Sequence, residues 1–433
     1  MAPRVRLVPT ERTSFLYKKL QKVENKNKEH VRHSDKIVLA FSGGLDTSCC
    51  VIYLKEQGYD VVTVTVDTGG FSKAEIVKIA AQSKLLGAKS HYFVDGKKEL
   101  FNKFISYIIK GNILRGGVYP LCAGTERLII AQKLIEVAQK VGAHHVAHGS
   151  TGAGNDQIRF SVALQVLAPE LKVLAPIRDL GVKREEELEL LKKHHIPFSL
   201  KTSTYSVNQS LLGDTISGLE TKNSWDSPSE EIFSDISPLS KTPQSPTTFI
   251  LSFEKGLPTA LNGKKLSGIS IMEYLNKIGS QHGVGTGIHL GDTILGIKGR
   301  IAFAAPAAII LIKAHKELEK LVQTKWQLFW KDTLSDFYGN LLHEALYFDP
   351  VMRDLEAFID SSQEHVTGNV RVELFKGNVI IKGCQSPYSL MNPDVATYGE
   401  ENVLWDSRDV AGFAKIYALS GMLAANVKRK KNI

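Results

Sequence analysis

The chain has 433 residues, of which 43% are hydrophobic and 23% are charged, and this apolar content suits two packed domains. The formal net charge is +9, but residues 1–35 carry +5 of it and residues 428–431 carry the other +4. A basic excess confined to the two ends is typical of solvated termini, so we expect no nucleic-acid partner.

The four cysteines form neither a C-x-x-C pair nor an evenly spaced framework, so the pattern signals no zinc site and no disulfide scaffold. The longest apolar run, residues 301–312, is shorter than the roughly 20 residues that span a bilayer. Residues 1–35 form a basic N-terminal extension without the apolar core of a secretory signal. We therefore expect a cytoplasmic protein with no membrane partner, and we assign the extension no function.

From residue 36 the chain alternates short β-branched segments with segments of helical periodicity. The predicted strands cover residues 36–41, 59–66, 90–94, 144–149 and 171–177. The segments between them repeat apolar residues every three or four positions, as helices do. Repeated strand–helix pairs predict a parallel α/β sheet in a first domain over residues 36–205, with ligands bound at the carboxyl ends of its strands.

The first predicted strand runs into the segment SGGLDTS, residues 42–48, before a helix begins. Gly43 and Gly44 allow unusual backbone torsions and close approach of a ligand, while Ser42, Thr47 and Ser48 supply hydroxyl groups. The first turn of the helix adds unpaired N–H groups. The segment therefore predicts an anion-binding loop; a simple tight turn capped by Asp46 and Thr47 is the weaker alternative.

A second polar motif, HGSTGAGNDQIRF at residues 148–160, follows the fourth predicted strand. Gly149, Gly152 and Gly154 keep this loop thin, and five polar side chains of different kinds follow within nine residues: Thr151, Asn155, Asp156, Gln157 and Arg159. An amino-acid ligand needs such a mixture, with a carboxylate for its ammonium group and donors for its carboxylate. His148 is predicted to be a structural hydrogen-bonding residue at the strand end.

No Walker A loop and no Rossmann fingerprint is present. Residues 42–48 instead resemble the pyrophosphate loop of the N-type ATP pyrophosphatases, which have an adenine nucleotide α-hydrolase-like fold. The two motifs together resemble the argininosuccinate synthase family. The segments LAPIRD (174–179), YSVNQSLLG (205–213) and HGVG (282–285) support this resemblance, which extends from residue 36 to about 425.

The resemblance implies a ligation in which the ureido oxygen of citrulline attacks the α-phosphorus of ATP, pyrophosphate leaves, and the amine of aspartate displaces AMP. It implies ATP and Mg²⁺ as cofactors, with no residue assigned to the metal. The implied catalytic residues are Asp46, Asn155, Asp156 and Arg159. ATP would be held by Ala40, Phe41, Ser42, Gly43, Gly44, Leu45, Asp46, Thr47, Ser48, Val66 and Gly149. Aspartate would be held by Thr151, Asn155 and Asp156, and citrulline by Tyr119, Asn155, Arg159, Ser206 and Thr215.

Three positions differ from the family pattern, and all belong to the citrulline site. Gly124 stands where the pattern has Ser, Gly291 where it has Glu, and Phe303 where it has Tyr. A hydrogen bond to a charged group is worth roughly 1.5 to 3 kcal/mol, so loss of the Glu affects the acceptor most. We expect a divergent branch that keeps the reaction, with Asp292 in the role of the Glu. Another adenylating enzyme with a different ureido or amide acceptor, or a non-catalytic nucleotide-binding sensor, are the alternatives.

After residue 205 the composition changes. A Pro- and Ser-rich connection at 221–246 is followed by antiparallel strands with a turn at Asn262-Gly263. Helices are predicted at about 268–280, 306–322, 325–347 and 350–361, with a hairpin at 368–383. These segments predict an α+β synthetase or multimerisation domain over residues 206–400, in which Trp326, Trp330 and Tyr338 are core residues.

The last segment, residues 401–433, has the pattern of an amphipathic helix followed by a basic tail. In the family that the chain resembles, a C-terminal helix reaches another subunit. The resemblance therefore implies an oligomerisation helix and a homotetramer.

Overall fold

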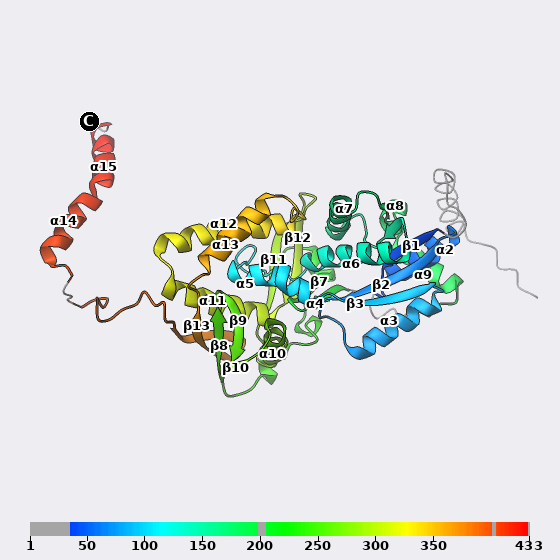
Figure 1. Cartoon of the computed structure of the whole chain (residues 1–433), viewed down its shortest axis with the longest axis horizontal. Helices are drawn as coiled ribbons and strands as arrows, with labels where there is room; N and C mark the ends of the chain where they lie inside the picture. The colour runs from blue at the N-terminus through cyan, green and yellow to red at the C-terminus, as the bar shows by residue number, and fades with distance from the viewer. Residues whose placement is uncertain (1–34, 198–204, 401–403, 432–433) are drawn as a thin grey trace, which may run out of the picture.

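The computed structural model of the chain describes residues 35–197, 205–400 and 404–431, so the N-terminal extension lies almost entirely outside the described residues. Figure 1 shows an elongated body with the first α/β part at one end and the later strands and helices at the other. The two C-terminal helices extend away from this body.

The first part is built on a five-stranded parallel sheet, which confirms the predicted fold class. Its order is β3-β2-β1-β4-β5. The strands are β1 (Lys36–Ala40), β2 (Asp60–Asp67), β3 (Ser90–Asp95), β4 (His145–Ala147) and β5 (Lys172–Leu174). The chain winds outward from β1 in one direction and from β4 in the other, so the switch point lies between β1 and β4. The loops after these two strands therefore share one crevice.

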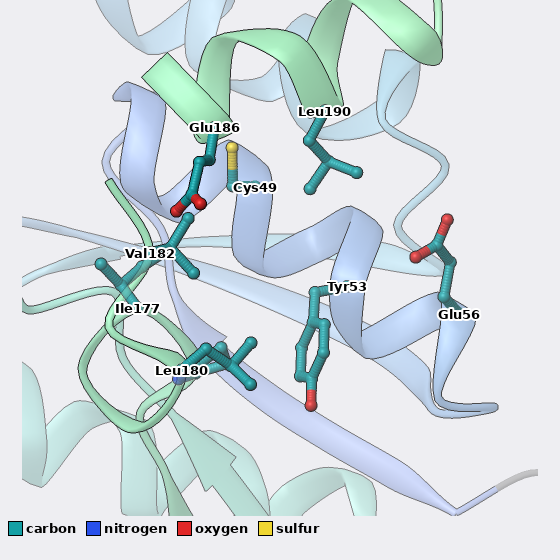
Figure 2. Close-up of a pocket in the computed structure, with 9 residues that line it drawn as sticks. Cys49, Tyr53, Glu56, Ile177, Leu180, Val182, Glu186 and Leu190 are labelled. Atoms are coloured by element: carbon teal, nitrogen blue, oxygen red, sulfur yellow. The ribbon is translucent and has the colours of Figure 1, made fainter. Parts of the chain in front are cut away.

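Helices cover both faces of this sheet. They are α2 (Leu45–Glu56), α3 (Lys73–Leu85), α6 (Thr125–Val141), α7 (Asp156–Leu167), α8 (Pro176–Leu180) and α9 (Arg184–Lys193). The helix predicted after β3 is divided into α4 (Lys97–Leu100), a π-helical turn η1 (Phe101–Ile105) and α5 (Ser106–Lys110). Helices α8 and α9 pack on α2, and Figure 2 shows Cys49 and Tyr53 facing Leu180 and Leu190 across a small apolar pocket. This packing fixes the helix that follows the glycine-rich loop.

The second part contains two antiparallel sheets. One has the order β11-β12-β7-β6 and consists of β6 (Tyr205–Ser210), β7 (Gly213–Gly218), β11 (Thr286–Asp292) and β12 (Lys298–Ala304). The other has the order β10-β9-β8-β13-β14 and consists of β8 (Thr247–Glu254), β9 (Leu257–Leu261), β10 (Lys264–Lys265), β13 (Gly368–Phe375) and β14 (Asn378–Gln385). The predicted Asn262-Gly263 turn joins β9 to β10, while Lys255-Gly256 joins β8 to β9.

The helices of the second part match their predicted positions. They are α10 (Gly268–Gln281), α11 (Pro306–Val322), α12 (Lys325–His343) and α13 (Val351–Ser362). The Pro- and Ser-rich connection contains only the 3-10 turns η3 (Leu219–Lys222), η4 (Glu230–Ile232) and η5 (Leu239–Lys241). Most residues of helix α11 are buried. Its apolar residues join one continuous core with residues of the parallel sheet, such as Val38, and of β13, such as Val370.

The continuous core encloses a charged pair. Lys331 Nζ on α12 lies 2.7 Å from Glu319 Oε2 on α11, and both side chains are 0% exposed. Asn112 and Gln363 also donate hydrogen bonds to the Glu319 carboxylate. The pair is therefore satisfied by polar neighbours, as buried charges require.

One core prediction on α12 is partly wrong. Tyr338 is buried, but Trp326 and Trp330 are 63% and 53% exposed. Helical spacing defines a stripe of side chains without saying which stripe faces the core. On α12 the inner stripe contains Lys331, Tyr338 and Leu342, and the tryptophans lie outside it.

The C-terminal segment forms two helices, α14 (Ser407–Tyr417) and α15 (Leu419–Lys431), rather than the single predicted one. Their apolar side chains are exposed, including Val410, Phe413, Ile416, Met422 and Leu423. Among the described residues no single helix has the length and apolarity to cross a membrane, although this bent pair meets the two criteria together.

Candidate active site

The glycine-rich loop after β1 is held in an open conformation by its own polar groups. The Phe41 N–H donates to Val64 O, and Thr65 Oγ1 donates to the Phe41 carbonyl, so the loop leaves the sheet in a fixed direction. Gly43 has a φ of +73°, which favours glycine. Gly44 precedes α2 without a side-chain cap, and its N–H donates weakly to Ser42 Oγ at 3.3 Å. The helix N-terminus is therefore available to an anion, as predicted.

The hydroxyl groups of this loop converge. Ser42 Oγ lies 3.3 Å from Thr47 Oγ1, and Ser48 Oγ donates to the Gly44 carbonyl at 2.7 Å. Of the other predicted ATP residues, Ala40 ends β1, and Phe41, Leu45 and Val66 are buried beneath the loop. Ser48 is also fully buried, and its hydroxyl accepts a hydrogen bond from Gln82 Nε2 at 2.9 Å. The polar surface of the loop therefore consists of the Ser42 and Thr47 hydroxyls and the N–H groups, and the buried residues support it.

Gly149 brings the second motif against the first. A Cβ atom at Gly149 would lie 3.0 Å from Thr47 Cγ2 and 3.2 Å from Thr47 N. Such distances are tighter than most real Cβ contacts, so a larger residue here would push Thr47 away by a few tenths of an ångström. The two motifs are about 100 residues apart in the sequence, and the switch point between β1 and β4 places them in direct contact.

The Asp46 side chain faces α9 as well as the loop. It forms a side-chain hydrogen bond with Glu187, and burial raises the pKa of Asp46. Burial and the nearby Asp46 raise the pKa of Glu187 to about 8. One proton shared between the two carboxyl groups accounts for both directions.

His148 is fully buried and stacks on Phe160 at 5.0 Å between ring centroids. Its Nδ1 accepts the Ser150 N–H at 3.3 Å, and burial followed by Arg178 lowers its pKa to about 4. The imidazole is therefore neutral and orients the loop, in agreement with its predicted structural role.

Three hydrogen bonds hold the polar residues of the second motif, one from a backbone N–H group and two from guanidinium groups. Asn155 Oδ1 accepts the Ile294 N–H at 3.0 Å, which ties this loop to the connection between β11 and β12. Asp156 accepts hydrogen bonds from Arg127 Nε and Arg159 Nη1, both at 2.9 Å. Thr151 is exposed at the mouth of the loop. The residues predicted to bind aspartate therefore lie at the end of one loop and the start of α7, beside the glycine-rich loop.

Asp156 is the best-stabilised carboxylate of the site. Burial opposes its ionisation, but Arg127 and Arg159 outweigh this effect and lower its pKa to about 2. The side chain is 26% exposed, so it stays accessible to a small ligand. A permanently ionised carboxylate of this kind suits the recognition of an ammonium group.

The predicted citrulline residues lie on the other side of Asp156. Arg159 is buried and donates through Nη2 to the His343 carbonyl at 3.1 Å. Tyr119 is also buried, and its hydroxyl accepts the Ala123 N–H at 2.8 Å. Thr215 lies opposite Asn208 in the β6–β7 register, and Ser206, two positions along β6, shares that face. Asn208 in turn accepts a hydrogen bond from Arg127, so all of these residues surround one region.

The three positions that depart from the family pattern lie in this region. A Cβ at Gly124, whose φ is +120°, would lie 2.8 Å from the Arg159 guanidinium carbon. A Cβ at Gly291 would lie 2.6 Å from His289 Nε2 and 3.0 Å from Arg115 Nη1. The Phe303 ring lies 5.4 Å from the Tyr119 ring and beside Thr215 in the register. Neighbouring side chains thus occupy the space at both glycines.

The geometry does not support the hypothesis that Asp292 replaces the missing Glu. Successive residues of a strand point to opposite faces, so Asp292 faces away from the side of Gly291. Its carboxylate is 59% exposed and pairs with Lys298 at 2.6 Å. Only its carbonyl oxygen approaches the site, where it accepts a hydrogen bond from Arg115.

Sequence reasoning missed several residues of this region: Arg115, Glu126, Arg127, Asn208, His289 and His343. Arg127 left a detectable signal, because a cation in the first turn of a helix is unfavourable unless it has an anionic partner. Glu126 is buried; its Oε2 accepts the Gly124 N–H, and its Oε1 has no hydrogen-bond partner among the described residues. The remaining residues come from distant segments and carried no local signal.

The arrangement can position an anionic phosphate chain at one end and an amino acid at the other. The described residues contain no group of three or more His, Cys, Asp or Glu side chains that can hold a metal ion. Catalysis by such a site depends on orientation and charge stabilisation.

Comparisons with known proteins identify the same two segments. The family model described as arginosuccinate synthase N-terminal HUP domain matches residues 36–197, and the arginosuccinate synthase C-terminal domain matches residues 205–424. The argininosuccinate synthase of Methanocaldococcus jannaschii is 40% identical over 398 residues, which cover 91% of this chain and 99% of that protein. That of Shouchella clausii is 41% identical over 398 residues, covering 92% and 98%. That of Rubrobacter xylanophilus is 40% identical over 393 residues, covering 90% and 95%.

Among solved structures, a predicted subunit of tRNA methyltransferase from Methanocaldococcus jannaschii is 16% identical, with a TM-score of 0.27. It covers 36% of this chain and 74% of that chain, and at this TM-score the likeness carries no argument.

Proposed function

The chain belongs to the argininosuccinate synthase family, and we propose that it joins citrulline to aspartate through a citrullyl-adenylate, releasing pyrophosphate and then AMP. It is a ligase of arginine biosynthesis that uses ATP. The observation that carries the proposed mechanism is the contact of Gly149 with Thr47, which sets the phosphate loop and the amino-acid loop side by side.

In the first step the ureido oxygen of citrulline attacks the α-phosphorus of ATP, and the bond to the bridging oxygen of pyrophosphate breaks. The glycine-rich loop holds the phosphates through the N–H groups at the start of α2 and the hydroxyls of Ser42 and Thr47, while the buried Ser48 hydroxyl donates to the Gly44 carbonyl and so supports the loop. The proposed ATP residues are those predicted from the sequence: Ala40, Phe41, Ser42, Gly43, Gly44, Leu45, Asp46, Thr47, Ser48, Val66 and Gly149. Fixed donors near the leaving pyrophosphate stabilise its growing charge.

In the second step the amine of aspartate attacks the ureido carbon of the adenylate, and AMP leaves with the former ureido oxygen. Thr151, Asn155 and Asp156 are proposed to hold aspartate, with the ionised Asp156 near its ammonium group. Tyr119, Asn155, Arg159, Ser206 and Thr215 are proposed to hold citrulline. Asp46, Asn155, Asp156 and Arg159 act on the reaction by orientation and charge, since the mechanism needs no covalent enzyme intermediate.

We propose that Mg²⁺ accompanies the phosphates of ATP. Nucleotide-bound Mg²⁺ is usually held by phosphate oxygens and one or two protein carboxylates, which fits a loop that offers Asp46 and no dedicated metal cage among the described residues. The ion would offset the negative charge between Asp46 and the phosphates.

We further propose a cytoplasmic homotetramer divided into a nucleotide-binding domain (36–205), a synthetase and multimerisation domain (206–400) and a C-terminal oligomerisation segment (401–433). The exposed apolar side chains of α14 and α15 support the assignment of that segment, because isolated helices with such faces are normally covered by a partner.

The test is pyrophosphate release from ATP and Mg²⁺ with citrulline alone, with aspartate alone and with both. We expect release that depends on citrulline, and argininosuccinate and AMP in equal amounts when aspartate is added. The same rate of pyrophosphate release with and without citrulline would contradict citrulline as the acceptor.

A further inference from the structure

We propose that Arg115 is a specificity-determining residue of the acceptor pocket and that it receives a carboxylate group of the acceptor. This inference rests on the proposed function and deepens it, since it names the group by which the ureido substrate is selected.

The first observation is the exchange of charge at Gly291. The family pattern has an acidic side chain at this position, and here the space is occupied by His289 and Arg115. A Cβ at Gly291 would come within 2.6 Å of the imidazole and 3.0 Å of the guanidinium, so no other side chain fits without displacing them. An acidic side chain at position 291 would attract a cationic group, whereas the guanidinium that occupies this space attracts an anionic one.

The second observation is the set of polar contacts of Arg115, whose charge also interacts at longer range with the carboxylates of Asp292 and Glu344. The guanidinium, which is half-buried, forms a hydrogen bond with His289 Nε2 at 3.2 Å and donates one to the Asp292 carbonyl at 2.9 Å. Within the described part of the chain, no carboxylate oxygen forms an ion pair with it. Partly buried charges are normally paired, so this guanidinium has both the charge and the spare N–H groups for an anionic ligand.

The third observation places Arg115 in the acceptor region. His289, which lies against Arg115, stacks on the Tyr119 ring with centroids 5.3 Å apart and an interplanar angle of 19°. Tyr119 is one of the proposed citrulline residues. His289 therefore acts as a rigid spacer that fixes the guanidinium at the edge of the acceptor pocket.

The fourth observation is the charge balance of the surrounding groups. Arg127 and Arg159 both form ion pairs with the Asp156 carboxylate. Glu126 Oε1 lies 3.7 Å from Arg127 Nη1. Asp292 and Glu344 also interact electrostatically with Arg115, so four carboxyl groups surround the three guanidinium groups. Burial raises the pKa of one of them, Glu126. Asp156 is shared by Arg127 and Arg159, whereas Arg115 forms no ion pair among the described residues and can turn toward a ligand carboxylate.

These contacts predict which acceptors are selected. A planar guanidinium can bind a carboxylate through two parallel hydrogen bonds, which a neutral amide cannot imitate. The acidic side chain that the family pattern has at position 291 is absent from this chain. The acceptor class is therefore ureido carboxylates, with the carboxylate more important than the ammonium.

The experiment compares three acceptors: citrulline, 5-ureidopentanoate, which lacks the ammonium, and N-carbamoylputrescine, which lacks the carboxylate. Pyrophosphate release gives kcat and KM, and calorimetry gives binding of each compound. For the unaltered chain we expect similar KM values for the two carboxylates and a KM at least about 10-fold higher for N-carbamoylputrescine.

The variant is Arg115→Gln. We expect KM to rise roughly 10- to 100-fold for citrulline and 5-ureidopentanoate, with kcat little changed and with no change for N-carbamoylputrescine. Arg115→Lys, which keeps the charge, should restore part of the loss. Arg300→Gln is the matched control, because Arg300 is also half-buried and donates to the backbone carbonyls of residues 220, 223 and 226.

An equal KM increase for all three compounds in Arg115→Gln, or none, would overturn the role of Arg115. Failure of the reaction itself is recognised separately. If no compound releases pyrophosphate, carboxylate-dependent binding that Arg115→Gln removes would still support Arg115, and binding indifferent to the variant would reject it.

Discussion

At the scale of single residues, Gly149 allows the loop after β4 to lie close to the glycine-rich loop after β1. Gly149→Ala places a methyl group 3.0 Å from Thr47 Cγ2, and overpacking of this kind costs about 1–3 kcal/mol. We expect kcat/KM for citrulline to fall at least about 10-fold, because the loops would move apart.

Steady-state kinetics of Gly149→Ala and Gly154→Ala provide the comparison. A Cβ at Gly154 meets only Thr151 Oγ1 at an ordinary 3.8 Å, so the second variant should change kcat/KM much less. Equal kinetics for the two variants would show that the contact with Thr47 is unimportant.

The residues that the sequence did not reveal share a physical property. The glycine-rich loop and the GNDQIR segment are local patterns, so their polar surfaces could be predicted. Arg115 and His289 are 174 positions apart, and their contact depends on how β11 meets the loop before Tyr119. No spacing rule in the sequence predicts such a pair. The sequence shows that Gly291 lacks a side chain, but it does not show that Arg115 and His289 fill that space.

At the scale of elements, periodicity predicted the five parallel strands and the helices α10, α11 and α13 closely, because each has one clear pattern and a Gly or Pro near an end. The predictions that failed concern which face of a helix is buried and where the regular helical winding is interrupted. The two tryptophans of α12 form an apolar stripe that points outward, and the helix after β3 contains a π-helical turn that periodicity does not encode. Burial of one stripe in preference to another depends on partners elsewhere in the chain.

The contact between α2 and α9 predicts an unusual dependence of stability on pH. The pKa of Glu187 is raised from an ordinary 4.5 to about 8, so the folded state keeps a proton that the unfolded state loses. The stabilising contribution is complete below about pH 4.5 and is lost as the pH rises toward 8.

Glu187→Gln keeps a donor for Asp46 and cannot ionise. We expect this variant, free of nucleotide and metal, to unfold a few degrees higher than the unaltered chain at pH 8.5, with a smaller difference at pH 5.5. Thermal unfolding followed by circular dichroism measures both values. Glu189→Gln, an exposed change on the same helix, should show no such difference, and an identical pH profile in the two variants would refute the shared proton.

At the scale of the whole molecule, the buried Lys331–Glu319 pair connects α11 and α12 inside the continuous core. Lys331→Met leaves the Glu319 carboxylate buried without its cation, so we expect the free energy of unfolding to fall by about 3–5 kcal/mol. Urea unfolding followed by fluorescence measures the change.

Lys316→Met is the control for this prediction, because the Lys316–Asp332 pair on the same two helices is about half exposed. Surface pairs are worth roughly 0–1 kcal/mol, so a loss as large as that of Lys331→Met would show that burial is not the cause.

The C-terminal helices make a prediction about assembly. Phe413→Asp with Ile416→Asp places two charges on the exposed apolar face of α14 and should convert the proposed tetramer into smaller species, as seen by light scattering after size exclusion. Lys415→Asp changes charge on the same helix outside that face and should leave the mass unchanged. If the double variant is still a tetramer, α14 is not part of the subunit interface.

The approach of Gly149 to Thr47 also bears on how such an enzyme diversifies. The separation of the glycine-rich loop from the loop after β4 is limited at this point by main chain and by the absence of a side chain at Gly149. If the proposed acceptor region is correct, positions 115, 124, 289 and 291 lie outside this contact, and exchanges there leave the approach of the two loops unchanged. In such a scaffold, substitutions that change the preferred acceptor can occur at residues other than those that bring the two loops together.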